Sequence, residues 1–474
     1  MKPSIVGICI FLAVIINDVI SDKIKDGTKL NDVNFVPNIR IKRGISVTNS
    51  PTNFTAADND ADNLEDDDIV FVCGENDDET KCTCEEDQTL NCRGVTWDFF
   101  GNNLDHAKIK ISDKNFTVKI ADFTYSSIRN LKKDEILPGQ EATIANLIFQ
   151  SNTLKSIENG TFDKFVSLKK LNLQRNALTN INEKILSAKL GATLLELNLS
   201  LNKLQNLSLF AFQNLKNLIK LNLSLNRKIK LFNKINGINV TVFPEALSNL
   251  KILDLLGCNL ASVEDNTFIN LKNLEHLYLN NNPFIRVPKG ITKITKLISL
   301  NFADTLIQSL EDCDFCDLKN LKNLKFDYTF ELSYIHENAF GAISNKKPIS
   351  LDTFSIQLCN ISVLPEKLLN WKNLSKINIE SNPITCNCSM AWLINDYNAT
   401  TPMIVDKMID DSNVNYKNNI FCWNPSSLSG IRMNSLVIEF CMNETTVIQD
   451  TEKNDDTIYH VCSDKGEEDT LLVL

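Results

Sequence analysis

The sequence predicts an α/β solenoid in which a parallel β-sheet lines the concave face and cysteine-rich caps cover both ends. Leucines recur along the middle of the chain with a period of about 24 residues, which is the mark of a repeat architecture. Clusters of four cysteines stand before and after these repeats, and an apolar run opens the chain. A single coil cannot bury its own apolar edge, so we expect stacked neighbours to build one continuous core.

The repeating unit is clearest where Leu168 is followed by Leu171, Leu173, Asn176 and Leu178. Its centre alternates with period two, which predicts a short strand with leucines inward and the intervening residues on an exposed face. Further copies begin at Ile144, Leu194, Leu218, Leu250, Leu274, Leu297, Leu321, Leu351 and Leu374. We therefore expect about 10 to 11 repeats over residues 115–383.

The ninth position of each repeat is polar although it follows buried leucines. An asparagine there can turn inward and hydrogen-bond backbone groups of the neighbouring coil that no water reaches. Cys258 and Cys359 stand at this position in two repeats, and Thr305 and Thr329 stand there in two others. We expect a ladder of inward polar side chains with these four substitutions.

The pattern L-x-x-L-x-L-x-x-[NC]-x-L resembles that of the leucine-rich-repeat family. The segment after the repeats also resembles the C-terminal cap of extracellular members, because Asn382-Pro383 precedes Cys386-x-Cys388 and Trp392, Cys422 and Cys441 follow. The resemblance covers about residues 73–441 and implies a horseshoe with a disulfide cap at each end. The chain resembles the ectodomains of Toll-like receptors and Slit-type proteins, and we expect no transmembrane or signalling domain in it.

The resemblance also implies how the cap cysteines pair. It implies the disulfides Cys73–Cys84, Cys82–Cys92, Cys386–Cys422 and Cys388–Cys441. The residues alone leave three connectivities open in each cap. Zinc binding is the rival interpretation of clustered cysteines, and an exported chain with repeats between the clusters disfavours it.

Three other cysteines have no assigned role. Cys313 and Cys316 form a C-x-x-C motif that closes a local bridge or acts as a redox pair. Cys462 either links two chains as a disulfide dimer or stays a thiol.

The first residues predict export. Lys2 precedes an apolar run, Ile5 to Ile16, that is too short to span a bilayer, so residues 1–21 are interpreted as a signal peptide, with an N-terminal anchor as the alternative. Residues 22–70 are acidic and expected to be disordered. Within them, Arg40 to Arg43 resembles a proprotein-convertase site that would end a propeptide at Arg43; a basic patch in a linker is the other interpretation. The remaining boundaries are an N-terminal cap at 71–114, a C-terminal cap at 384–441 and an acidic tail at 442–474.

N-x-[ST] sequons are numerous, as expected for an exported chain. The predicted glycosylation sites are Asn53, Asn115, Asn159, Asn198, Asn206, Asn222, Asn239, Asn360, Asn373, Asn398 and Asn443. Asn387 lies between two cysteines and is not expected to carry glycan. Glycan on Asn198 and Asn222 would obstruct the N-terminal half of the concave groove.

Composition and motifs favour binding over catalysis. A formal charge of −10 and a pI near 5.1 argue against nucleic acid and anionic membranes as partners. The four histidines have no neighbours at metal-ligand spacing, and no nucleophile elbow or phosphate-binding loop is present. We expect no enzyme activity, cofactor or metal.

The exposed positions of the strands predict a protein-binding surface, because tyrosines flanked by charge are typical of interaction hot spots. The predicted partner-binding residues are His276, Tyr278, Asn280, Asp304, Lys325, Asp327 and Tyr328. The leading hypothesis is a secreted protein that binds another extracellular protein, in immune recognition or as a soluble decoy. The alternatives are a structural or matrix scaffold component and the ectodomain fragment of a Toll-like receptor.

Overall fold

The computed structural model describes residues 70–73, 82–94, 109–113, 115–341, 349–397, 399–408, 419–437, 459–462 and 470–472. All of them belong to the compact unit Glu65–Leu474. The predicted signal peptide, the candidate cleavage site at Arg43, Cys441, and the sequons at Asn53, Asn398 and Asn443 lie outside the described residues.

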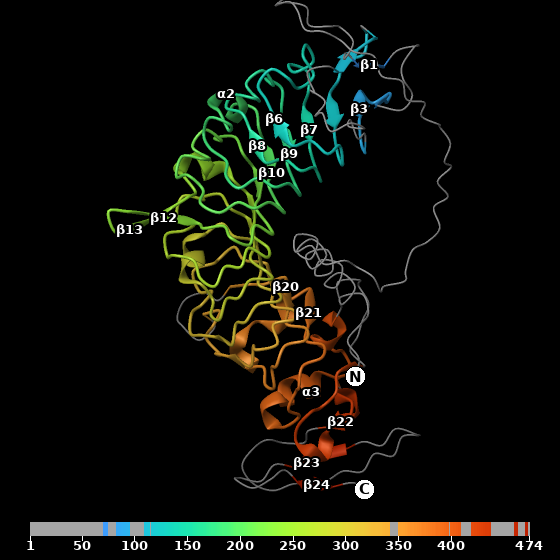
Figure 1. The fold of residues 1–474 in the computed structure, drawn as a ribbon. Helices are drawn as coiled ribbons and strands as arrows, with labels where there is room; N and C mark the ends of the chain where they lie inside the picture. The colour runs from blue at the N-terminus through green and yellow to red at the C-terminus, as the bar shows by residue number, and fades with distance from the viewer. Residues whose placement is uncertain are drawn as a thin grey trace, which may run out of the picture. The chain divides into compact units, whose positions relative to one another are not determined.

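A sheet of 13 strands runs the length of this unit, and its order follows the chain (Figure 1). The strands are β2 (Thr83–Cys84), β3 (Thr89–Asn91), β5 (Ile120–Asp122), β7 (Asn146–Ile148), β9 (Lys170–Asn172), β10 (Glu196–Asn198), β11 (Lys220–Asn222), β14 (Ile252–Asp254), β15 (His276–Tyr278), β16 (Ser299–Asn301), β18 (Asn323–Lys325), β20 (Thr353–Ser355) and β21 (Lys376–Asn378). Only β2 and β3 pair antiparallel; every later neighbour is parallel and in register. The predicted parallel-strand solenoid is confirmed.

The core forms because each three-residue strand of the main sheet buries its middle residue, while in most of these strands the two residues beside it stay at least partly exposed. In β10 the middle residue Leu197 is buried between partly exposed Glu196 and Asn198. On the opposite side of the coils, a column of phenylalanines is buried as well, and Phe315 stacks on Phe340 with ring centroids 5.2 Å apart. Leucines on one side and rings on the other therefore fill the interior of each coil.

The polar ladder is also confirmed. Asn176 Nδ2 donates to the Phe149 carbonyl at 2.8 Å, and Asn176 Oδ1 accepts the Leu154 N–H at 3.0 Å. Cys258 and Cys359 take the same place, and each Sγ lies against a carbonyl of an earlier coil. Burial raises the pKa of both thiols to about 12. The ladder thus satisfies backbone groups inside the solenoid that the strands leave unpaired.

One residue before the ladder position, the backbone turns through the left-handed region in coil after coil. The residues in this turn column include Tyr125, Ser151, Arg175, Leu201, Leu225, Gly257, Asn281, Asp304, Tyr328, Leu358 and Ser381. The N–H groups of the column from Tyr125 to Leu358 donate to the next coil, as Tyr328 does to the Gln357 carbonyl at 2.8 Å. The interlocked coils impose this conformation even on residues other than glycine.

Shorter elements fill the remaining sides of the coils. They are the small sheets β6 (Asn130–Leu131) with β8 (Ser156–Ile157) and β17 (Ser309–Leu310) with β19 (Tyr334–Ile335), the helices α2 (Ala188–Gly191) and α3 (Ala391–Tyr397), and the 3-10 turns η3 (Glu245–Asn249), η4 (Lys289–Lys293), η5 (Glu366–Leu368), η6 (Trp371–Asn373), η7 (Cys388–Met390), η8 (Val405–Lys407), η10 (Ser426–Leu428) and η11 (Met433–Ser435). The long interval between strands β11 and β14 contains an antiparallel hairpin, β12 (Phe232–Ile235) with β13 (Ile238–Thr241). Among the described residues, no helix is long and apolar enough to cross a membrane.

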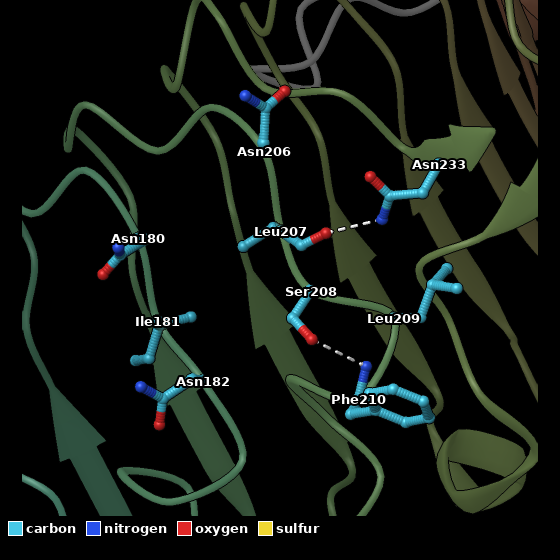
Figure 2. A pocket seen from close by; sticks show the side chains of 9 residues that line it. All are labelled: Asn180, Ile181, Asn182, Asn206, Leu207, Ser208, Leu209, Phe210 and Asn233. Carbon is cyan, nitrogen blue, oxygen red and sulfur yellow. Dashed lines mark hydrogen bonds between the residues drawn. The ribbon is translucent and has the colours of Figure 1, made fainter. Parts of the chain in front are cut away.

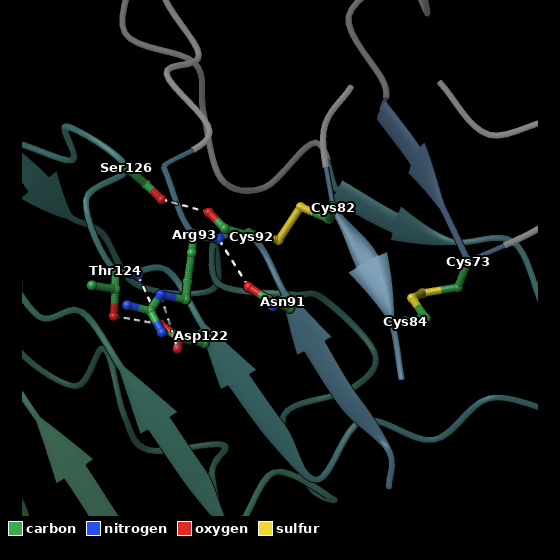
Figure 3. Close-up of a disulfide and its surroundings, with 9 residues drawn as sticks. All are labelled: Cys73, Cys82, Cys84, Asn91, Cys92, Arg93, Asp122, Thr124 and Ser126. Atoms are coloured by element: carbon green, nitrogen blue, oxygen red, sulfur yellow. Dashed lines mark hydrogen bonds and ion pairs between the residues drawn. A yellow bond between two sulfur atoms is a disulfide. The ribbon is translucent and has the colours of Figure 1, made fainter. Parts of the chain in front are cut away.

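The N-terminal cap is built on two disulfides, Cys73–Cys84 and Cys82–Cys92 (Figure 3). Strand β1 (Val70–Val72) pairs parallel with β4 (Ile109–Ile111) beside them. Ser126 Oγ donates to the Cys92 carbonyl at 2.8 Å and so ties the cap to the first full coil. The cap continues the main sheet through β2 and β3 and covers the end of the core.

The C-terminal end holds the Cys386–Cys422 disulfide, and Cys388 is disulfide-bonded as well. Strand β22 (Leu436–Val437) pairs with β23 (Tyr459–Cys462), which pairs with β24 (Thr470–Leu472). The segment expected to be an acidic tail therefore contributes two strands beside the cap. Of the alternatives for Cys313 and Cys316, the structure contains the local disulfide.

Candidate functional site

The register of the sheet brings part of the predicted binding surface together. The third residues of successive strands lie side by side in a row: Asp254, Tyr278, Asn301, Lys325 and Ser355. His276 lies in the adjoining row of first residues, next to Ser299. An acid, an aromatic ring, an amide and an ammonium group thus line one stretch of the concave face. The five third residues Asp254, Tyr278, Asn301, Lys325 and Ser355 are hereafter called the concave row.

In most strands, the third residue stabilises the turn that follows the strand. In eight strands this residue is Asp or Asn, and its side-chain oxygen accepts the N–H two residues later. These residues are Asn91, Asp122, Asn172, Asn198, Asn222, Asp254, Asn301 and Asn378. Ile148, Tyr278, Lys325 and Ser355 interrupt the series. Among these four, only Tyr278 and Lys325 have polar side chains that are partly exposed, and a lysine ammonium has no acceptor to offer. These two side chains therefore do not serve the turn that their neighbours stabilise.

Asp327 was predicted to be part of the binding surface, but its side chain is buried. It is 7% exposed, and its Oδ1 accepts hydrogen bonds from Ser355 Oγ and from the Gln357 N–H. Because Asp327 is two residues after Lys325, the alternation of the strand predicts that both side chains face the concave side. The next coil, however, covers Asp327. Asp327 therefore fixes the turn after β20 instead of facing a partner.

Asp304 and Tyr328 lie beside the concave row, in the turn column. Asp304 is exposed and accepts a hydrogen bond from Asn281 Nδ2 at 2.8 Å, while partial burial raises the pKa of its carboxyl. Tyr328 is 46% exposed. Asn280 is partly buried, and within the described residues its Oδ1 has no hydrogen-bond donor. These three residues form the edge of the surface, not its centre.

A flank of the same coils exposes large apolar side chains that the sequence reasoning missed. They are Ile285, Leu306, Phe330 and Tyr334, each between 48% and 61% exposed. Leu306 and Phe330 directly follow the ladder residues Thr305 and Thr329, where most repeats carry polar or small residues. That departure was the signal available in the sequence.

The predicted glycosylation sites fall into two groups. Asn115, Asn159, Asn206, Asn239, Asn360 and Asn373 are exposed. Asn198 and Asn222 are partly buried neighbours on β10 and β11, and they line a concave cavity of about 230 Å³ together with Lys170 and Lys220. Their oxygens accept the N–H groups of Ser200 and Ser224, so both amides are part of the regular turn.

A second cavity, of about 390 Å³, lies between two coils away from the concave row (Figure 2). Asn180, Ile181 and Asn182 line one side of it, and Ser208 and Phe210 line the other. Asn233 closes it by donating to the Leu207 carbonyl at 2.7 Å. Its amide, hydroxyl and apolar groups offer hydrogen bonds and packing, and its lining residues include no acid, no base and no cysteine.

Among the described residues, no three His, Cys, Asp or Glu side chains are arranged as metal ligands would be.

One carboxyl away from the concave row has a shifted pKa: burial raises the pKa of Asp314 to about 6. Asp314 stands between the bonded Cys313 and Cys316 and accepts the Glu311 N–H at 2.7 Å. It is a local structural feature, away from the concave row.

The chain is similar to receptor-type leucine-rich-repeat proteins. It is 26% identical over 306 residues to the CD180 antigen of Mus musculus, which covers 63% of this chain and 43% of that protein. It is 28% identical over 204 residues to the transforming growth factor beta activator LRRC33 of Danio rerio, which covers 43% of this chain and 28% of that protein. The chain thus spans less than half the length of either relative. No protein-family model matches it.

Solved structures with a similar fold include the mouse RP105/MD-1 complex, with a TM-score of 0.48 and 20% identity over 72% of this chain and 59% of that chain. A leucine-rich-repeat protein of Leptospira interrogans gives a TM-score of 0.41 and 23% identity over 59% of this chain and 70% of that chain.

Proposed function

We propose that this leucine-rich-repeat chain is exported and binds another extracellular protein through the concave row, with Tyr278 and Lys325 as its anchors. It would act in extracellular recognition, as a soluble binder or decoy. The observation that carries the proposal is that Tyr278 and Lys325, two strands apart, place partly exposed polar side chains where most strands have a turn-stabilising Asp or Asn.

The surroundings of these two residues support a protein ligand. Tyr278 has Asp254 on one side and Asn301 on the other, so the ring is bordered by hydrogen-bonding groups. Interfaces of this kind combine a partly buried aromatic anchor with charged groups that set specificity. His276 adds a third polar side chain beside Tyr278, two residues earlier on the same strand.

The test uses the exported chain and a panel of purified extracellular domains, with binding measured by surface plasmon resonance. Truncation of a hot-spot residue costs about 2 kcal/mol or more, or about thirtyfold in Kd. We expect Tyr278→Ala and Lys325→Ala each to weaken a saturable interaction by this order. Tyr125→Ala is the control, because Tyr125 is an exposed tyrosine in the turn after β5, several coils away from the concave row.

Two results would contradict the proposal. One is a chain retained inside the cell when it is expressed with its own first residues. The other is a specific ligand whose affinity is unchanged by both concave-row substitutions.

A further inference from the structure

Leu306, Phe330 and Asn360 stand in corresponding turns of three neighbouring coils, although the middle coil has one more residue, Glu331, before its buried Leu332. Each directly follows a ladder residue, namely Thr305, Thr329 and Cys359. Thr305 and Thr329 lie with their hydroxyl oxygens 3.4 Å apart, and Cys359 Sγ reaches the Phe326 carbonyl of the preceding coil. The Asn360 N–H donates to the Leu332 carbonyl at 2.9 Å, so the two coils are in direct contact next to Phe330.

The surface around this position is apolar. Phe330 is 61% exposed and Leu306 beside it is 48% exposed, while Tyr328 and Tyr334 of the same coil are 46% and 53% exposed. Exposed apolar groups that gather in this way normally mark a covered or interacting surface. Leu306, Tyr328, Phe330 and Tyr334 are hereafter called the aromatic flank.

The residue that borders the aromatic flank on the C-terminal side is a sequon. Asn360-Ile361-Ser362 matches N-x-S, and the Asn360 side chain is exposed. An N-linked glycan there begins with N-acetylglucosamine, whose ring has a face of C–H groups. Such a face packs on an aromatic ring, while the hydroxyl groups stay in water.

We propose that Asn360 carries an N-linked glycan whose first sugars lie over the Phe330 ring and cover the aromatic flank. The inference rests on the proposed function in one respect, since N-glycosylation requires export through the secretory pathway. It assigns the flank to the chain's own carbohydrate instead of a protein ligand. A partner would then reach Tyr278 and Lys325 from the concave side, with Tyr328 at the border of the covered area.

Hydroxyl-radical footprinting of the exported glycoprotein tests this placement, with oxidation of each ring quantified by peptide mass spectrometry. We expect Asn360→Gln to increase oxidation of Phe330 several-fold. Phe210 is the internal control, because it is 57% exposed on a distant coil and its oxidation should not change. Asn159→Gln is the matched control variant, since it removes another exposed sequon and should leave Phe330 protected.

Glycopeptide mapping of the same protein completes the test. Export with Asn360 unmodified would overturn the inference, and so would an occupied Asn360 with equal Phe330 oxidation in the wild type and in Asn360→Gln. Either result leaves the binding proposal standing, because that proposal depends on Tyr278 and Lys325. If Tyr278→Ala and Lys325→Ala leave binding unchanged while Phe330 stays protected in the glycosylated chain, the binding proposal fails and the glycan inference stands.

Discussion

Asn282 joins two coils by accepting the N–H of Leu260 on Oδ1 at 2.9 Å while its Nδ2 donates to the Leu255 carbonyl at 2.9 Å. Asn282 is 2% exposed, so no solvent can replace these partners. The same two-sided contact recurs at Asn176, Asn202 and Asn226. The ladder is therefore a continuous polar element inside an otherwise apolar core.

Removal of this side chain should destabilise the solenoid. Asn282→Ala leaves a buried N–H and a buried carbonyl unpaired, and we expect it to lower the free energy of unfolding by about 2–3 kcal/mol. Urea unfolding followed by circular dichroism measures the change. Asn180→Ala is the control, because Asn180 is exposed; equal losses for the two variants would contradict a structural role for the ladder.

Gly191 should tolerate no side chain. A Cβ built at Gly191 lies 2.0 Å from the Asn214 carbonyl oxygen of the next coil, a contact that only backbone movement can relieve. We expect Gly191→Ala to cost about 3 kcal/mol or more. Gly237→Ala is the comparison, because Gly237 has a positive φ of 83° but open space around it, and its cost should be about 1 kcal/mol. A smaller effect at Gly191 than at Gly237 would show that the coils separate easily.

The two types of disulfide should differ in stabilisation. Cys386–Cys422 closes a loop of 36 residues, whereas Cys313–Cys316 closes one of 3. Loop-closure entropy gives about 4 kcal/mol for the first and about 1.5 kcal/mol for the second. Thermal unfolding of the two double-serine variants measures the difference. A larger loss from the Cys313/Cys316 pair would mean that this bridge holds more than its own turn.

Asp314 should make stability depend on pH. Burial raises the pKa of this carboxyl to about 6 in the folded chain, so the folded state holds its proton at a pH where the unfolded state has lost it. Stability from this group is full below about pH 4 and falls as the pH rises through 6. Because the side chain is only partly buried, we expect Asp314→Asn to stabilise the chain by about 1 kcal/mol at pH 7.

Melting temperatures of the wild type and Asp314→Asn at pH 3.5 and pH 7 check this prediction. The advantage of the variant should disappear at the lower pH. Asp317→Asn controls for the change in net charge, since Asp317 is exposed on the same turn. A constant difference across the pH range would point to packing instead of ionisation.

The sequence alone predicted the features that repeat. Leucine spacing, the inward Asn and the convex phenylalanines are set by local periodicity, and each coil sees nearly the same neighbours. For that reason the strand at Leu197 and the ladder at Asn176 could be predicted before any coordinates. The cap cysteines could be located in the same way, and their pairing rested on family resemblance.

What departed from the repeat was decided only by the tertiary structure. Asp327 has the spacing of an exposed residue, yet a neighbouring coil buries it, because exposure depends on what the next 24 or so residues place above it. The insertion after β11 formed a hairpin because Phe232–Ile235 and Ile238–Thr241 could pair antiparallel across the positive-φ turn at Asn236 and Gly237. The positions of Phe330 and Asn360 on one flank follow from the alignment of coils, which sequence spacing fixes only when every repeat has the same length. Local periodicity thus determined the solenoid, and contacts between coils of unequal length determined its surfaces.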